Sequence, residues 1–290
     1  MKAIATLGPP GTFSDIATQK YLHHLGHPEN FTIRYYRSIK QAFRSIGAGC
    51  DYGVLPIENL SEGFVQVVLD LLQEGDLELI HELFLPIHFS FVANASALST
   101  LEQIYVQFVA KGQCANFLES FQKTTIVSTE SNIESLNLLQ ASQTPAGAIA
   151  PADAVNAGDF PTLIENVGDY RHNTTRFVTL ASQGIASYAR PEALDASESK
   201  TSLVILDDND YPGLLVSLLG CFSKRSINLR SIMSRPTRAY IGKYHFFIDI
   251  EGHQQNPLIR EAIAEVAQLN KVKVLGSYPA ARYPETVDSA

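Results

Sequence analysis

The chain alternates short strand-like segments with helix-like segments, and this alternation constrains its fold more than any other feature. Before residue 183, the runs AIATLG, FTIRYY and YGVLPIEN are separated by segments 13–25 and 39–47 that read as helices. A second series runs from LELIHELFLPIHFSFVAN to AGAIA, with helices expected near 113–121 and 133–139. Such alternation favours a layered α/β fold, and two series fit two lobes better than one sheet.

The pattern changes after a polar segment, which marks a second domain. Residues 183–199 lack sustained apolar periodicity and read as a linker. Residues 200–279 then follow the order β-α-β-β-α-β, the ferredoxin-like arrangement, and 280–290 read as a loose tail. We therefore expect an α/β protein with a first domain over 1–182, followed by a ferredoxin-like domain. The first domain divides into lobe 1, about 1–80 and 165–182, and lobe 2, about 81–164.

Charge and cysteine content exclude several classes of protein. A net charge of −8 argues against a general nucleic-acid surface, because phosphate binding relies on basic patches. The three cysteines are far apart and show neither metal-binding spacing nor a disulfide framework, so we expect no metal site. The N-terminal apolar run is too short for a signal sequence, and no segment approaches the roughly 20 apolar residues of a membrane span. These features predict a soluble, cytoplasmic protein.

Two stretches place polar residues after predicted strands, where open α/β sheets bind ligands. LGPPGTFSD, residues 7–15, brings backbone amides and hydroxyls to a helix start, where an anion can bind. The alternative is a tight turn with Thr12 or Ser14 as the helix cap. The stretch 7–15 lacks the spacing of a phosphate loop or a dinucleotide fingerprint.

The second stretch is GVLPIENLSEGFV, residues 53–65, which ends an apolar strand in polar side chains and then enters a helix through Gly63. Asn59 and Ser61 either bind a ligand or cap that helix. On strand ends alone, we expect the site in the loops after Leu7, Val54 and Phe89.

A third stretch, HNTTRF, joins two hydroxyls, a permanent cation and an aromatic ring at the start of a predicted strand. In an extended chain, Thr175 and Phe177 face one side, while Thr174 and Arg176 face the other. Arg176 would then support a site from behind. The alternative is a solvated, threonine-rich strand start.

Taken together, the three stretches resemble the prephenate dehydratase family followed by an ACT regulatory domain. GPPGTFS is similar to the family's Gly-Pro-x-Gly-Thr-Phe-Ser opening, PIENLSEG to its Pro-Ile-Glu-Asn motif, and NTTRF to its Asn-x-Thr-Arg-Phe motif. The resemblance covers nearly the whole chain in the family's order. It implies a two-lobed catalytic domain, similar in shape to periplasmic binding proteins, ahead of the ferredoxin-like ACT domain.

The resemblance implies conversion of prephenate to phenylpyruvate, carbon dioxide and water, in phenylalanine biosynthesis and without a cofactor. Aromatisation of the ring drives this reaction, so the protein must add a proton donor at the leaving hydroxyl and fixed donors around two carboxylates. Thr175 corresponds to the family's donor. The implied substrate-binding residues are Thr12, Asn59, Ser61, Gln113, Arg176 and Phe177, with backbone amides near Gly11 and Ser61.

The chain departs from the family's motifs at two points near the expected site. Leu60 follows Asn59 where the family has serine or threonine, and VQFVAKGQC stands where the family has a Ser-His-Pro-Gln stretch before its Gln-Cys pair. Gln113 and Cys114 match, but the expected substrate-facing serine falls on Val106. Losing this hydroxyl would lower the rate or change the preference among prephenate-like acids.

ACT domains of this family pair across subunits and bind phenylalanine between them, so the resemblance implies a homodimer or homotetramer with phenylalanine as effector. Two changes weaken the expected site: Leu214 adds bulk where the family has alanine, and Met233 replaces a glutamate. An ACT domain retained for dimerisation alone is the alternative. The implied effector residues are Pro212, Gly213, Leu214, Leu215, Asn228, Met233, Ser234 and Arg235.

Other functions remain open on the sequence. A prephenate decarboxylase would release carbon dioxide but keep the hydroxyl, which needs no donor at Thr175, and an arogenate dehydratase would act on the related amino acid. A non-catalytic sensor of aromatic acids would bind substrate without turnover. Product analysis distinguishes these alternatives.

Overall fold

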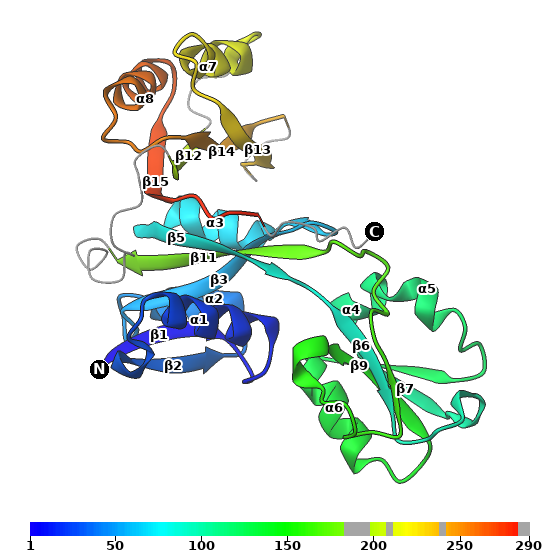
Figure 1. Ribbon diagram of the computed structural model, residues 1–290. Helices are drawn as coiled ribbons and strands as arrows, with labels where there is room; N and C mark the ends of the chain where they lie inside the picture. Colours follow the sequence, from blue (N-terminus) through cyan, green and yellow to red (C-terminus); the bar gives the residue numbers. More distant parts are fainter. Residues whose placement is uncertain (183–197, 207–210, 238–241, 284–290) are drawn as a thin grey trace.

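The computed structural model describes residues 1–182, 198–206, 211–237 and 242–283, which form three β-sheets flanked by helices (Figure 1). The strand orders are β2-β1-β3-β11-β5 with β4 on β3, then β10-β6-β9-β7-β8, and finally β13-β14-β12-β15. We call the three parts the first lobe, the second lobe and the C-terminal domain. The mixed α/β class expected from the sequence is confirmed.

The first lobe contains parallel pairs β1–β2 and β1–β3 and the antiparallel strand β11, which lies between β3 and β5. Its elements are β1 (Lys2–Leu7), α1 (Phe13–His24), η1 (Pro28–Asn30), β2 (Phe31–Tyr36), α2 (Ile39–Ser45), β3 (Tyr52–Asn59), β4 (Gly63–Phe64), α3 (Gln66–Glu74), β5 (Leu77–Pro86) and β11 (Thr174–Ser182). Since β5 continues to Pro86, the change of sheet comes later than residue 80, where we expected it.

The second lobe carries a mixed sheet, in which β7 runs parallel to β8 and β9 while β6 is antiparallel to β9 and β10. Its elements are β6 (Phe89–Ala93), η2 (Leu98–Thr100), β7 (Gln103–Gln107), α4 (Phe108–Gln113), α5 (Ala115–Leu118), β8 (Thr125–Thr129), α6 (Asn132–Ala141), β9 (Ala146–Pro151), η3 (Ala152–Ala154) and β10 (Thr162–Ile164).

One helix of the second lobe was predicted in the wrong place. Instead of one helix near 113–121, two short helices meet at Cys114, whose backbone leaves the helical region at φ −126° and ψ 28°. The first begins earlier than expected because the Gln107 side chain accepts hydrogen bonds from the amides of Val109 and Ala110 and so caps it.

The C-terminal domain has the predicted β-α-β-β-α-β order in an antiparallel sheet. Its elements are β12 (Ser199–Ile205), α7 (Leu214–Ser223), β13 (Leu229–Pro236), β14 (Tyr244–Glu251), α8 (Pro257–Leu269) and β15 (Val272–Pro279). Most of the predicted linker, 183–197, and the end of the predicted tail, 284–290, lie outside the described residues.

The C-terminal domain packs against the first lobe, on the side away from the second lobe (Figure 1). Gly276 of β15 comes so close to β5 that a Cβ atom there would lie 2.1 Å from the Leu79 carbonyl oxygen, and its φ of +152° also favours glycine. Leu79 belongs to a hydrophobic core in which Val178 and Leu180 of β11 pack with Tyr278 of β15. The two domains therefore share a buried interface.

Ionic contacts fix the same interface at helix α3. The Arg235 guanidinium donates two hydrogen bonds of 2.8 Å to the carboxylate of Asp70 and one of 2.8 Å to Gln66. Lys273 donates to carbonyl oxygens at the end of α3, including that of Leu72 at 3.1 Å. A cation there also offsets the negative end of the helix dipole. Helix α3 is thus held along its length by the C-terminal domain.

His81 in β5 is buried beneath α1, and its Nδ1 atom has no hydrogen-bond partner among the described residues. Burial, assisted by the nearby His24, lowers the pKa of His81 to about 4, whereas an unfolded histidine titrates near 6.5. Unfolded chains therefore bind more protons between these values. The contribution that neutral His81 makes to the free energy of unfolding is complete above about pH 6.5 and is lost as the pH falls towards 4.

We expect His81→Phe to reduce this acid sensitivity, because phenylalanine keeps a ring against Tyr21 but takes up no proton. Between pH 7 and pH 5 the wild type should lose about 2 kcal/mol more than the variant in its free energy of unfolding, measured with urea. His88→Gln, at an exposed histidine, serves as the control. Equal losses in wild type and His81→Phe would contradict this account.

Among the described residues, no helix has both the length and the apolar character that crossing a membrane requires.

Candidate active site

A cavity of about 420 Å³ lies between the first and second lobes. Its walls come from the loop after β1, the end of β3, the start of β11, helix α4 and the start of α6. The loop after Leu7 lines it as expected. Val54 was the wrong position, because β3 continues to Asn59, and Phe89 begins a strand instead of ending one, although its ring does line the cavity.

Thr175 lies in the cavity wall at the start of β11, directly opposite Asn59 on the neighbouring strand. The Asn59 amide nitrogen donates a hydrogen bond of 2.8 Å to the Thr175 hydroxyl oxygen. Because a hydroxyl that accepts one hydrogen bond keeps its own proton to donate, this contact leaves the Thr175 proton free for a ligand.

Asn59 belongs to a closed ring of side-chain hydrogen bonds that joins both lobes. It donates to Asn173 at 2.9 Å, Asn173 donates to Gln113 at 3.2 Å, Gln113 donates to Ser61 at 3.2 Å, and Ser61 donates to Asn59 at 2.7 Å. Networks in which each polar group is satisfied hold side chains in one orientation. The ring therefore fixes the donor that positions Thr175.

The alternative that Asn59 or Ser61 caps a helix is wrong. Helix α3 begins at Gln66, after Val65, which makes no side-chain cap. The Asn59 side chain instead accepts hydrogen bonds from the amides of Ser61 and Glu62, at 3.0 and 3.1 Å, and so closes the turn after β3. The Ser61 amide is therefore not free to hold a carboxylate, contrary to our expectation.

The loop after β1 is also committed to internal contacts. Thr12 lines the cavity but caps α1, since its hydroxyl donates to Leu7 at 3.2 Å and accepts from the Asp15 amide at 3.4 Å. The Gly11 amide, expected to meet a ligand, donates to the Asp15 carboxylate at 2.7 Å. Asp15 also accepts from Tyr35, which fastens the loop to β2.

Two helix starts face the cavity from opposite lobes. Phe13 and Ser14 of α1 line it on one side, and Ser131 and Asn132 of α6 on the other. The first amides of a helix and its dipole favour anions. No lysine or arginine occurs among the described lining residues. The partial positive charge that favours an anion therefore comes from the amides at these two helix starts.

Arg176 does not line the cavity, so its assignment as a substrate-binding residue is not supported. Its side chain points to the other face of β11, as strand alternation predicted, and is buried against the C-terminal domain. Glu82 and Asp249 neutralise its charge at 2.7 Å each. It therefore adds little positive potential to the cavity.

Apolar side chains complete the walls. Phe177 and Phe89 line the cavity, and Phe13 meets Phe89 edge to face at 5.5 Å. Val106, where a substrate-facing serine was expected, is fully buried in the core, while the next residue, Gln107, lines the cavity instead. The side chain at 106 is therefore part of the packing of the second lobe.

The described residues contain no group of three or more His, Cys, Asp or Glu side chains placed to hold a metal ion. Burial, with help from the Asp169 charge, raises the pKa of Cys114 to about 12. Its thiol stays protonated at neutral pH and packs as a small apolar group.

The expected effector residues separate into two groups in the C-terminal domain. Gly213, Leu214 and Leu215 line a second cavity of about 270 Å³ at the start of α7, and Pro212 precedes it. Gly213 has a φ of +92°, which only glycine adopts without strain. The cavity wall also includes Tyr211, Val216, Gly242, Tyr244 and Phe246, which sequence reasoning missed.

The other expected effector residues lie elsewhere. Arg235 is paired with Asp70, and Met233 packs into the core shared with the first lobe. Asn228 donates to Glu251 at 3.1 Å, and Ser234 lies opposite Phe246 on β14. Arg235 and Met233 therefore dock the domain, and this corrects their assignment to an effector site.

Sequence reasoning also missed several residues of the main cavity. Asn173, which does not line the cavity but joins Asn59 to Gln113 beside it, lies inside the NTTRF stretch and was not assigned a role. Ser131 was detectable, since its hydroxyl accepts from the Glu134 amide at 3.1 Å in the S-x-x-E pattern that begins helices. Glu62 and Gln107 also line the cavity and lie inside quoted stretches without an assigned role, while Glu130 and Asn132 line it outside any motif.

Comparison with known families gives two matches. The family described as Prephenate dehydratase matches residues 4–184, and the family described as ACT domain matches residues 209–268.

Several known proteins similar to the chain are named as prephenate dehydratases. Prephenate dehydratase of Bacillus subtilis is 32% identical over 295 residues, covering 95% of this chain and 98% of that protein. The bifunctional chorismate mutase/prephenate dehydratase of Aquifex aeolicus is 31% identical, covering 97% of this chain and 75% of that protein. The crystal structure of Arthrobacter aurescens prephenate dehydratase with L-Phe is 31% identical, covers 97% of this chain and 90% of that chain, and has a TM-score of 0.79.

Proposed function

The chain belongs to the prephenate dehydratase family and converts prephenate to phenylpyruvate, carbon dioxide and water, and we propose that the reaction takes place in the cavity between its two lobes. We also propose residues 1–182 as the catalytic domain and 200–279 as the ACT regulatory domain. The observation that supports this site best is the hydrogen bond from Asn59 to Thr175 in the cavity wall.

In this proposal Thr175 is the catalytic residue. Its hydroxyl donates a hydrogen bond to the ring hydroxyl as that group leaves, while the ring carboxylate departs as carbon dioxide from the opposite end of the ring. A threonine hydroxyl is a weak acid, so Thr175 positions and relays the proton and does not become fully ionised. Preorganised donors of this kind stabilise charge as it develops in the transition state.

The remaining cavity residues bind and orient prephenate. The starts of α1 and α6, on opposite lobes, suit the two carboxylates, and Thr12, Asn59 and Gln113 line the cavity between them. Ser61 does not line the cavity but hydrogen-bonds to Asn59 and Gln113 and so holds them in place. Phe177 and Phe89 enclose the ring and exclude water. The walls come from two lobes, so we propose that the lobes close on the substrate.

We propose that phenylalanine regulates the enzyme at the start of α7 in the ACT domain, where Gly213, Leu214 and Leu215 line a cavity. The Arthrobacter aurescens relative in complex with L-Phe supports this. Val216 and Tyr244 are exposed apolar residues of the same cavity, which fits pairing of ACT domains between subunits in a cytoplasmic homodimer or homotetramer.

The test is to incubate the purified protein with prephenate, and separately with arogenate, at neutral pH and to follow the products by chromatography, with and without phenylalanine. We expect phenylpyruvate to form and its rate to fall when phenylalanine is added. Arogenate as the only substrate, a non-aromatic decarboxylated product, or binding without turnover would each contradict prephenate dehydration. An unchanged rate with phenylalanine would contradict only the proposed effector site and would leave the catalytic proposal standing.

A further inference from the structure

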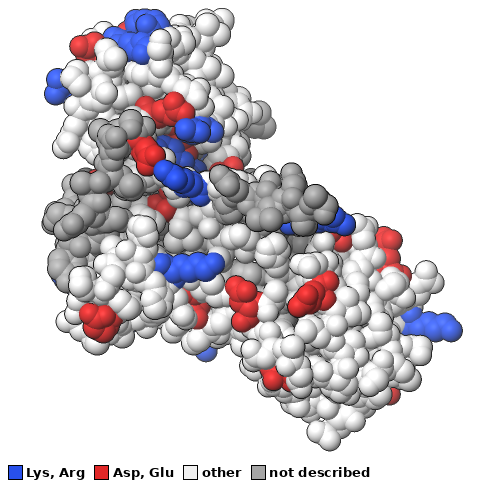
Figure 2. Space-filling model, viewed as in Figure 1, with Lys and Arg blue, Asp and Glu red and all other residues white. Residues whose placement is uncertain are grey.

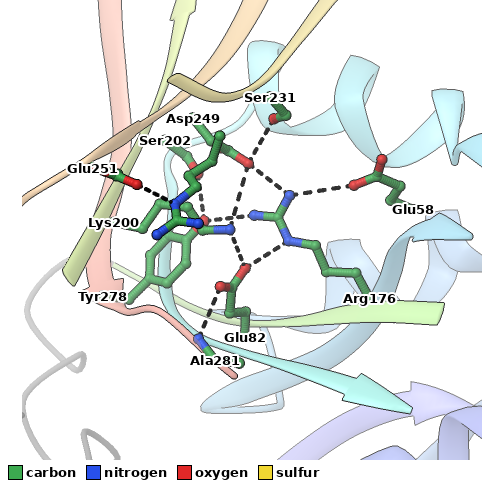
Figure 3. A network of polar contacts seen from close by, with 11 residues as sticks. Glu58, Glu82, Arg176, Lys200, Ser202, Ser231, Asp249, Glu251, Tyr278 and Ala281 are labelled. Carbon is green, nitrogen blue, oxygen red and sulfur yellow. Dashed lines mark hydrogen bonds and ion pairs between the residues drawn. The ribbon is translucent and has the colours of Figure 1, made fainter. Parts of the chain in front are cut away.

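Arg176 connects the strand that carries Thr175 to the sheet of the ACT domain (Figure 3). Its buried guanidinium donates through Nε to Glu82 at 2.7 Å, through Nη1 to Asp249 at 2.7 Å and through Nη2 to the Tyr278 hydroxyl at 2.9 Å. Glu82 belongs to the neighbouring strand β5, whereas Asp249 and Tyr278 belong to the ACT domain. Two of these three hydrogen-bond partners therefore come from the other domain, and Glu58 of β3 adds an ion pair at 3.7 Å.

Asp249 is held firmly at the centre of this network. Ser202 and Ser231 donate to its carboxylate, Ser231 at 2.9 Å, and Lys200 lies 3.9 Å away. Burial alone would raise the pKa of Asp249, but the positive charges of Arg176 and Lys200 outweigh it and hold the pKa below its usual value. Asp249 is therefore ionised at neutral pH and provides a fixed counter-charge for Arg176.

The network lies where charges of both signs meet between the ACT domain and the first lobe (Figure 2). Lys200 also pairs with Glu82 at 2.8 Å, and Glu58 lies 3.7 Å from Arg176, so cations and carboxylates of both domains meet across the interface. A buried charge that loses its partner is strongly destabilising. Arg176 therefore cannot move away from Asp249 unless the ACT domain moves with it.

The pairing of β11 with β3 is irregular beside this residue. Arg176 pairs with Glu58, but the next residue, Phe177, pairs with Pro56, so β3 carries an extra residue, Ile57, between the two pairs. Such bulges interrupt the ladder and change the direction of nearby side chains. Strand β11 keeps its regular pairing with β5 here, and the side-chain contacts of Arg176 add a second constraint where the pairing with β3 shifts.

We propose that Asp249 of the ACT domain is a positioning residue for catalysis, which fixes the start of β11 through Arg176 and so places the Thr175 hydroxyl in the cavity. Thr175 and Phe177, the chain neighbours of Arg176, point to the opposite face and line the cavity. The proposal rests on the proposed function of Thr175. It makes the ACT domain a structural part of the catalytic site even without effector.

The test is Asp249→Asn in the full chain, assayed with prephenate in the absence of phenylalanine. We expect kcat to fall about tenfold while KM changes less than threefold, because a small displacement of a catalytic group slows the reaction more than it weakens binding. The control is Glu265→Gln, which removes an ACT-domain carboxylate whose ion pairs with Lys224 and Arg225 lie within the same domain. It should keep kcat within twofold.

Tyr278→Phe provides a second, milder variant, since it removes one partner of Arg176 and keeps the ring in the core. We expect a threefold to fivefold loss of kcat from it. A folded Asp249→Asn or Tyr278→Phe protein with wild-type kcat would overturn the proposal, as would a rise in KM that accounts for the whole loss.

Hydrogen exchange separates this inference from the proposed function. Amides of residues 174–179 should exchange faster in Asp249→Asn than in wild type or Glu265→Gln, whatever substrate the enzyme uses. If the wild type does not convert prephenate, the proposed function fails, but the exchange result still tests the link. Unchanged exchange in β11 would reject the link even in an active enzyme.

Discussion

Thr175→Ala is expected to lower kcat for prephenate at least 100-fold with little change in stability. The variant removes the only side-chain donor at this position, while its neighbours in β11 keep their pairing with β3 and β5. Loss of one preorganised donor commonly costs a factor of 100 to 1,000, or about 3 to 4 kcal/mol in the activation free energy. Steady-state kinetics with prephenate, together with thermal unfolding, measures both quantities.

Two substitutions at nearby positions sharpen this test. Thr175→Ser keeps the hydroxyl and should retain much of the rate. Thr174→Ala is the matched control, because Thr174 is the preceding residue on the same strand, and its hydroxyl donates to the His172 carbonyl at 3.2 Å. It does not line the cavity, so its kcat should stay within threefold. Equal losses at both positions would show that disturbing the strand, and not removing the donor, slows the reaction.

The fold was largely predictable because its determinants are local. Strand and helix periodicity located the β-α-β-β-α-β order of the C-terminal domain, and the alternation of side chains along β11 separated Thr175 and Phe177 from Arg176. The start of α4 was not predictable in this way. It depends on the Gln107 side chain accepting two backbone hydrogen bonds, and glutamine is not among the usual capping residues.

The site was predictable only in part because its partners are distant in sequence. Asn59 and Thr175 are 116 residues apart, and only strand pairing brings them together. A similarly long separation concealed the role of Arg235. Its motif indicated an effector contact, but its guanidinium pairs with Asp70, 165 residues away. Motifs locate residues that matter but do not show which surface those residues face.

Asn59→Asp is expected to lower kcat about 100-fold at neutral pH while the turn after β3 is retained. The Asn59 nitrogen donates to Thr175, whereas its oxygen accepts from Ser61 and Glu62. Aspartate keeps the accepting oxygen but, when ionised, has no proton to donate. The Thr175 hydroxyl would then donate to the new carboxylate, and its proton would no longer face the substrate.

Two measurements distinguish this mechanism from simple damage to the site. Protonation of the new carboxylate restores a donor, so the ratio of variant to wild-type kcat should rise as the pH falls towards about 4, the usual pKa of aspartate. Because Asn59 acts through Thr175, the double variant Asn59→Asp/Thr175→Ala should be no slower than Thr175→Ala alone. The opposite result would be a fold-loss of kcat in the double variant equal to the product of the two single losses, with no recovery at acid pH. It would mean that Asn59 contacts the substrate directly and that another group orients Thr175.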